Sequence, residues 1–157
     1  MSISSAFSSL FGIAMLVGCF WFIATLQQKR WRWFSDRFGK ANLPAAIATR
    51  PVGPVVFSSA AHRELMATDY TTYRAMTLGV HREGLSIEWR GPNLYRNPPF
   101  LIPYDRISAA PSRWPDLLFD TVAVSHERLP GCYLIMAKSD IEWAIQQGAP
   151  MKIGKYV

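Results

Sequence analysis

The chain has 157 residues, half of them hydrophobic, and a formal net charge of +6 at pH 7. That apolar content fits one membrane span plus one small domain and excludes a polytopic helix bundle. Five of the 17 basic residues lie between positions 27 and 40 beside a single acid. A nucleic-acid-binding domain would spread its basic residues over the folded surface, so the sequence predicts no nucleic-acid partner.

A short tail, residues 1–6, precedes an uncharged apolar run at residues 7–26. Twenty residues in a helix extend about 30 Å, the thickness of a bilayer's hydrocarbon core. The run therefore predicts one transmembrane helix. A cleaved signal peptide is the alternative, but it needs a basic leading region and a shorter apolar core. Residues 1–6 carry no basic side chain, and we favour a retained anchor.

A basic and aromatic segment, residues 27–40, follows the span. Because all flanking Lys and Arg residues lie after the span, the positive-inside rule predicts a single-pass protein of the cell inner membrane with its N-terminus outside and its C-terminal domain in the cytoplasm. Aromatic rings among cations suit the headgroup layer, and the segment can continue the helix as an amphipathic stretch. The predicted membrane-interface anchor comprises Lys29, Arg30, Trp31, Arg32, Trp33 and Phe34. Between lipid recognition and a purely topological anchor, we prefer the latter.

Small residues recur four apart within the span, at Ser8 and Gly12 and again at Ala14 and Gly18. Such spacing lets helices approach closely, so it predicts an interface with another membrane helix. A plain anchor also tolerates glycine and alanine, which leaves the weaker alternative open.

Residues 41–54 contain three prolines and a glycine. Proline lacks a backbone donor and disfavours helix at the preceding residue. We interpret this segment as an extended linker that packs on the protein rather than moving freely.

Residues 55–150 show short strands separated by turns. The clearest pair is residues 74–80 and 85–90, with Gly84 expected to close the hairpin at positive φ. In the second strand, Leu85 and Ile87 are expected to face inward and Ser86 outward. Pro103 indicates an edge position or a bulge. Further strands are expected at 55–58, 100–107, 117–124 and 131–137; residues 62–73 are a loop or short helix, and 109–115 a loop.

A helix is predicted at residues 140–147, before a tail at 151–157. Ser139 and Glu142 have the spacing of a capping box, and Gly148 with Pro150 ends the helix. The fold class is therefore a single N-terminal transmembrane helix plus a small, mainly β (α+β) domain.

Two strand sequences together carry a motif of glycine, proline and apolar residues. Its residues here are Gly84, Leu85, Ile87, Pro98, Pro99, Leu101, Ile102, Pro103, Tyr104, Asp105 and Ile107. The motif resembles a pattern in poorly characterised bacterial single-span membrane proteins with a pleckstrin-homology-like (PH-like) cytoplasmic domain, many of which have Trp where this chain has Tyr104. The resemblance implies a curved antiparallel sheet or partial barrel with a C-terminal helix, acting as an interaction or assembly module, and it does not imply phosphoinositide binding.

No motif for nucleotide binding, metalloprotease or serine-hydrolase chemistry is present. The histidines His62, His81 and His126 are dispersed, and the last two lie in predicted turns where solvated histidine is the ordinary case. Cys19 in the span and Cys132 in the domain are separated by a membrane depth, which excludes a disulfide between them. We therefore expect no catalytic residues, no cofactor and no metal.

The sequence thus predicts a non-catalytic, membrane-anchored accessory or assembly subunit, a scaffold that packs its helix and cytoplasmic domain against a larger inner-membrane complex, for example a photosynthetic or respiratory electron-transport complex. Its partners would be membrane lipids and other membrane-protein subunits. The alternative is a membrane-tethered PH-like module that binds lipid or another ligand and regulates a partner.

Overall fold

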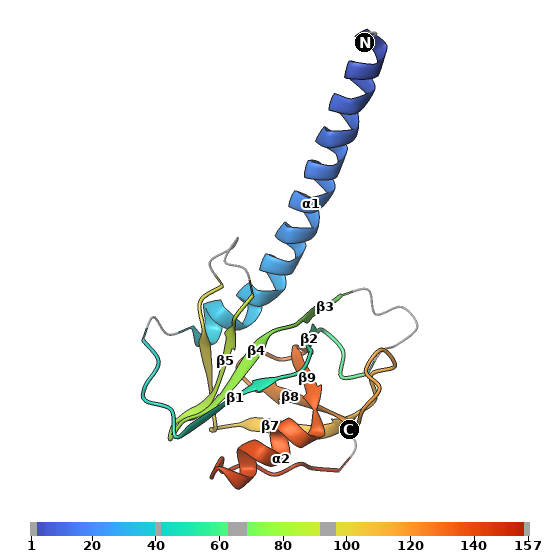
Figure 1. Cartoon of the computed structure of the whole chain (residues 1–157). Helices are drawn as coiled ribbons and strands as arrows, with labels where there is room; N and C mark the ends of the chain where they lie inside the picture. The colour runs from blue at the N-terminus through green and yellow to red at the C-terminus, as the bar shows by residue number, and fades with distance from the viewer. Residues whose placement is uncertain (1–2, 40–41, 63–68, 92–96, 156–157) are drawn as a thin grey trace.

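The computed structural model describes residues 3–39, 42–62, 69–91 and 97–155, with side chains from residue 10 onward except at positions 26 and 27. A long helix, α1 (Ile3–Phe38), projects from a β-domain, and the C-terminus lies on the opposite side of that domain (Figure 1). The strands are β1 (Ala48–Val52), β2 (Val55–Ser58), β3 (Tyr70–Tyr73), β4 (Met76–Val80), β5 (Gly84–Trp89), β6 (Phe100–Pro103), β7 (Ile107–Ser112), β8 (Thr121–His126) and β9 (Tyr133–Ala137), followed by helix α2 (Lys138–Gln146).

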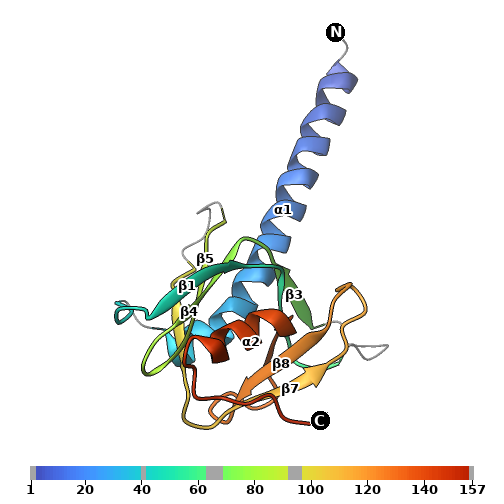
Figure 2. The same ribbon diagram turned by 60° about the horizontal axis from the view of Figure 1, so that its bottom comes forward.

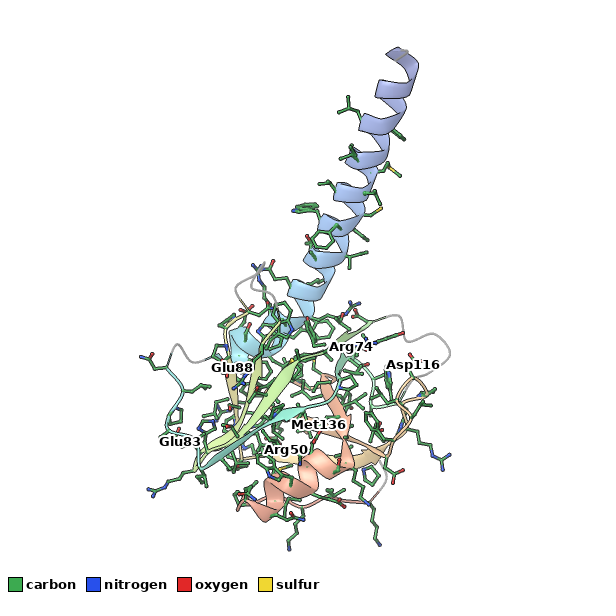
Figure 3. All side chains as sticks on the ribbon, viewed as in Figure 1. Arg50, Arg74, Glu83, Glu88, Asp116 and Met136 are labelled. Atoms are coloured by element: carbon green, nitrogen blue, oxygen red, sulfur yellow. The ribbon has the colours of Figure 1, made fainter. Side chains whose placement is uncertain are left out.

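The strands form two antiparallel sheets. One has the order β1-β4-β5-β6 and the other β3-β2-β9-β8-β7. They enclose a large core that includes Phe57, Leu78, Ile87 and Leu134, and Met136 points into this interior (Figure 3). A second, smaller cluster comprises Val56, Trp114, Ala123 and Ile135. Helix α2 packs against β4, β8 and β9 and lies across one end of the domain (Figure 2). No closed barrel forms among the described residues.

The last turns of α1 enter this core. Trp31, Phe34 and Phe38 are all at least 95% buried, and α1 contacts β2, β3 and β6. These three aromatic residues are spaced three and four positions apart, which places them on one face of the helix. The helix is thus continuous from its apolar part into the domain.

The predicted β4–β5 hairpin is confirmed, with Leu78 opposite Ile87. Gly84 does lie at the hairpin turn, but it does not have the predicted positive φ. Glycine is needed there because the backbone of β6 approaches closely: a Cβ at Gly84 would lie 2.1 Å from the backbone oxygen of Ile102. Ser86, predicted to face solvent, is buried and hydrogen-bonded to His81.

Two predicted loops contain strands. Residues 48–52 of the predicted linker are β1, which pairs with β4 at the sheet edge, where the missing donor of Pro51 is tolerated. Residues 109–112 of a predicted loop belong to β7, which pairs with β8 along its whole length. The predicted strand 100–107 is instead divided by a turn in which Arg106 has a φ of +64°. Pro103 does lie on an edge strand, as predicted. Residues 70–73 of the segment predicted as a loop or short helix are β3, and 63–68 lie outside the described residues.

Helix α2 begins two residues earlier than predicted and lacks the predicted capping box, since no side chain caps its N-terminus. The helix follows β9 directly, and the Lys138 backbone N–H donates instead to the Asp120 carbonyl at 2.8 Å. The helix ends at Gln146, one residue before the predicted end, and Gly148 stops it as predicted. Gly148 adopts a φ of +97° and donates its N–H to the Ile145 carbonyl, as glycine does after a helix C-terminus.

Candidate membrane-interface site

The apolar part of α1 stands clear of the domain. The described side chains from Leu10 to Ile23 are all exposed, and this part of the helix extends beyond the β-domain (Figure 3). Among the described residues, α1 is the one helix long and apolar enough to cross a membrane. A single span and a signal sequence share that property.

The ring of Trp31 fixes α1 in the domain. It stacks on Phe57 at a centroid distance of 5.4 Å and meets the edges of Tyr73 and Phe100 at 5.3 and 5.2 Å. Its Nε1–H donates to the Pro98 carbonyl at 2.9 Å, which satisfies the indole donor inside the core. These are the separations at which aromatic pairs attract beyond simple area burial.

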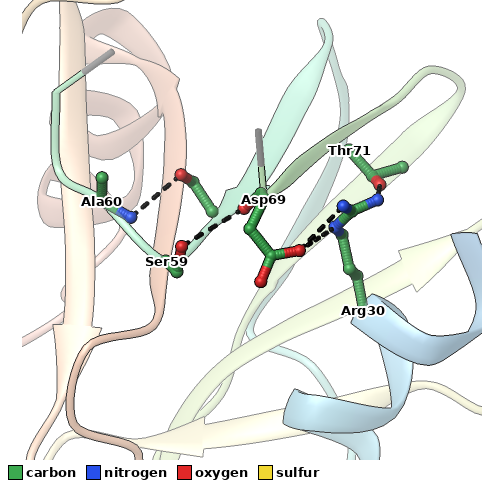
Figure 4. Close-up of polar contacts among 6 residues, drawn as sticks. Arg30, Ser59, Ala60, Asp69 and Thr71 are labelled. Carbon is green, nitrogen blue, oxygen red and sulfur yellow. Dashed lines mark hydrogen bonds and ion pairs between the residues drawn. The ribbon is translucent and has the colours of Figure 1, made fainter. Parts of the chain in front are cut away.

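A charged contact lies beside this aromatic cluster. The Arg30 guanidinium donates to the Asp69 carboxylate at 2.8 Å and to the Thr71 hydroxyl at 2.6 Å (Figure 4). Arg30 is largely buried, whereas Asp69 is about half exposed. The contact links α1 to the start of β3. Solvent screening leaves it a modest contribution beside that of the aromatic rings.

The end of α1 packs against a buried histidine. The ring of Phe38 meets the edge of His126 at 5.0 Å. His126 Nδ1 accepts the backbone N–H of Arg128 at 3.0 Å, and its Nε2 lies 3.8 Å from an Asp105 oxygen. Neither His126 nor His81 is solvated, so that expectation was wrong. Both lie at turns, as predicted, but each ring packs inside the domain and both residues are about 3% exposed.

Between α1 and the β8–β9 turn lies a groove of about 720 Å³. We call it the junction groove. Its cations are Lys29, Arg32, Arg37 and Arg128, and Asp36 is its one lining acid. The remaining lining residues are Thr25, Gln28, Trp33, Leu129 and Pro130.

The structure divides the six predicted interface residues into two groups. Trp31 and Phe34 are each 1% exposed and belong to the protein core, while Arg30 pairs with β3. Lys29, Arg32 and Trp33 line the junction groove. For these three, contact with the membrane surface stays a prediction. The apolar spacing of residues 31, 34 and 38 was the available sequence signal for the division.

Part of the predicted small-residue face of α1 forms a shallow hollow in the helix surface. Ala14 and Gly18 line a hollow of about 370 Å³ together with Phe11, Met15, Cys19 and Phe22. Gly12 does not line it, and a Cβ at Gly12 would meet no atom within 4 Å. The side chain of Ser8 lies outside the described residues.

One arrangement in the domain has the spacing of a nucleophile and its base. The Ser86 hydroxyl lies 2.8 Å from His81 Nε2. Among the described residues, His81 Nδ1 has no hydrogen-bond partner, so none of their acids orients the ring, and Ser86 is 5% exposed. Burial raises the pKa of the Cys132 thiol and the Asp69 carboxylate raises it further, which disfavours the reactive thiolate. Within the described ranges, no three His, Cys, Asp or Glu residues gather to hold a metal.

No protein-family model, curated protein or solved structure matches this chain.

Proposed function

We propose that this chain is a non-catalytic accessory or assembly subunit of a larger inner-membrane complex. The observation that carries the proposal is the continuity of α1 (Ile3–Phe38), whose apolar part is exposed and whose last turns lie in the domain core. A domain built around the end of its own anchor keeps a fixed distance and rotation relative to that anchor. Such fixed geometry suits a scaffold that meets a partner both within and beside the bilayer.

The same continuity supports a retained anchor over a cleaved signal sequence. Removal of α1 by cleavage would take Trp31 and Phe34 with it and leave their aromatic partners unpacked. The two antiparallel sheets and α2 support the PH-like interpretation of the domain. The basic residues after the span support a cytoplasmic domain and an outside N-terminus. Digestion of the domain by protease added outside intact cells would contradict this orientation.

The partner's helix is proposed to occupy the hollow at Ala14 and Gly18, where close approach of backbones is possible. The test is extraction from the native membrane in mild detergent, followed by size separation and mass spectrometry of co-migrating chains. We expect stoichiometric membrane subunits to co-migrate, and the Ala14→Leu/Gly18→Leu variant to lose them. Ile13→Trp adds comparable bulk at an exposed position outside the hollow, about 100° around the helix from Ala14 and about 140° from Gly18, and should retain them.

If the unmodified chain migrates alone, the scaffold proposal fails. The second candidate, a membrane-tethered PH-like lipid-binding module, then takes its place. The observation that favours the second candidate is the concentration of cations in the junction groove.

A further inference from the structure

The charges of the junction groove are largely uncompensated. Lys29 and Arg32 are exposed and have no ion-pair partner among the described residues. Arg37 donates from Nε to the Arg128 carbonyl at 3.0 Å, which leaves its positive charge unpaired by that contact. Arg128 does pair with Asp105, at 3.0 Å. The groove therefore holds excess positive charge that favours an anionic occupant.

The apolar part of the groove lining points to an amphipathic occupant. Trp33, Leu129 and Pro130 provide carbon surface beside the cations. At its N-terminal end, Thr25 lines the groove where the apolar run of α1 ends. A bound molecule can thus place a charged group among the arginines while its hydrocarbon follows α1 into the bilayer.

The groove and the small-residue hollow share one side of α1. Gly18, Thr25 and Arg32 follow one another at intervals of seven residues, and seven residues are two helical turns less about 20°. Phe22 and Lys29 have the same relation. The path from the cations therefore leads along the helix to the hollow at Ala14 and Gly18 rather than around to the far face.

We propose that the junction groove binds an anionic glycerophospholipid, with the headgroup phosphate between Lys29 and Arg32 and the acyl chains along α1 toward Gly18. The groove volume of about 720 Å³ lies within the usual range for ligand sites. An acidic peptide would satisfy the charges but would leave the apolar path along α1 unused. The inference rests on the proposed membrane anchoring, and it replaces a purely topological role for this basic segment.

The test uses the full-length chain in mild detergent, titrated with phosphatidylglycerol or with phosphatidylcholine of identical acyl chains and followed by native mass spectrometry. We expect phosphatidylglycerol to bind more tightly. The Lys29→Gln/Arg32→Gln variant should lose about fivefold in affinity for each cation removed, because a cation beside anionic headgroups has an effect of that order. Unchanged thermal unfolding midpoints would show that the variant folds, as expected for two exposed residues.

The matched control is Lys152→Gln/Lys155→Gln, which removes the same charge from exposed positions near the C-terminus that do not line the groove. Retention of the selectivity by this control supports the groove. An equal loss in both variants would mean attraction by net charge alone and would overturn the inference. Equal binding of the two lipids, or equally tight binding of free glycerol 3-phosphate, would also overturn it.

Failure of the anchoring itself has a different signature. If the full-length chain does not float with phosphatidylcholine vesicles in a density gradient, the proposed function is wrong. If it floats but shows no preference for phosphatidylglycerol in the titration, only the lipid site is wrong.

Discussion

Replacement of Trp31 by alanine tests the central feature of the structure, the insertion of α1 into the domain core. Trp31 is 1% exposed and contacts three aromatic rings at 5.2–5.4 Å. Truncation of a buried tryptophan costs about 3–5 kcal/mol. The Pro98 carbonyl also loses its donor. Since small domains are stable by roughly 5–15 kcal/mol, the variant should lose a large part of its free energy of unfolding.

The matched control is Trp33→Ala, two residues along the same helix. Trp33 is only partly buried and lines the junction groove, so its truncation should cost about 1–2 kcal/mol. The assay is urea unfolding of the full-length chain in mild detergent, followed by brief proteolysis of the unfolded fraction. If both tryptophans instead lay in the headgroup layer, as the sequence pattern predicts, the two variants would lose similar small amounts. That result would refute the inserted helix.

Two further predictions concern the β-domain. Gly84→Ala places a Cβ against the Ile102 carbonyl and should lower the free energy of unfolding by about 1–3 kcal/mol. The control is Gly53→Ala, whose Cβ meets no atom within 4 Å. It should change the free energy of unfolding by under about 0.5 kcal/mol in the same urea assay. Burial raises the pKa of Asp140, and the Arg50 charge opposes the rise. The folded state therefore keeps the proton on this carboxyl to a higher pH than the unfolded state does. As a result, the free energy of unfolding falls as pH rises through the folded-state pKa of Asp140. Asp140→Asn should therefore gain thermal stability relative to the unmodified chain between pH 4 and pH 7, and a constant or shrinking difference between their unfolding midpoints would contradict this.

Elements with a strong periodic pattern were predictable from the sequence. The β4–β5 hairpin alternates apolar and polar residues, and the uncharged apolar run predicts the helical part of α1 directly. Strand β7 (Ile107–Ser112) was missed because its residues are small or polar and carry proline, which is typical of loops. Strand β1 (Ala48–Val52) was missed for the same reason, because Pro51 hides an edge strand that only its pairing with β4 reveals.

It was harder to predict which residues of the basic segment are in the core and which are at the surface. Aromatic rings among cations fit a membrane headgroup layer and a protein core equally well. Next to a membrane span, Trp31 and Phe34 suit a headgroup layer as well as a core. Their burial depends on β2, β3 and β6, which follow far along the chain. The Ser86–His81 contact has the same origin. Strand alternation assigns Ser86 to the solvent face, but the residue is buried and its hydroxyl is hydrogen-bonded to His81 in the β4–β5 turn.

The shared helix face joins the two proposals physically. A partner helix seated on the hollow at Ala14 and Gly18 would meet, at its cytoplasmic end, whatever fills the junction groove. A phospholipid held there by Lys29 and Arg32 would then form part of the surface that the partner contacts, with its acyl chains packed beside the small residues. Because α1 is continuous and ends in the core, its rotation about its own axis is fixed relative to the domain. Lipid, partner helix and the β8–β9 turn that lines the groove would therefore meet on one side of the anchor. The domain core packs against the opposite face of α1 through Trp31, Phe34 and Phe38, an arrangement that a flexible tether could not ensure.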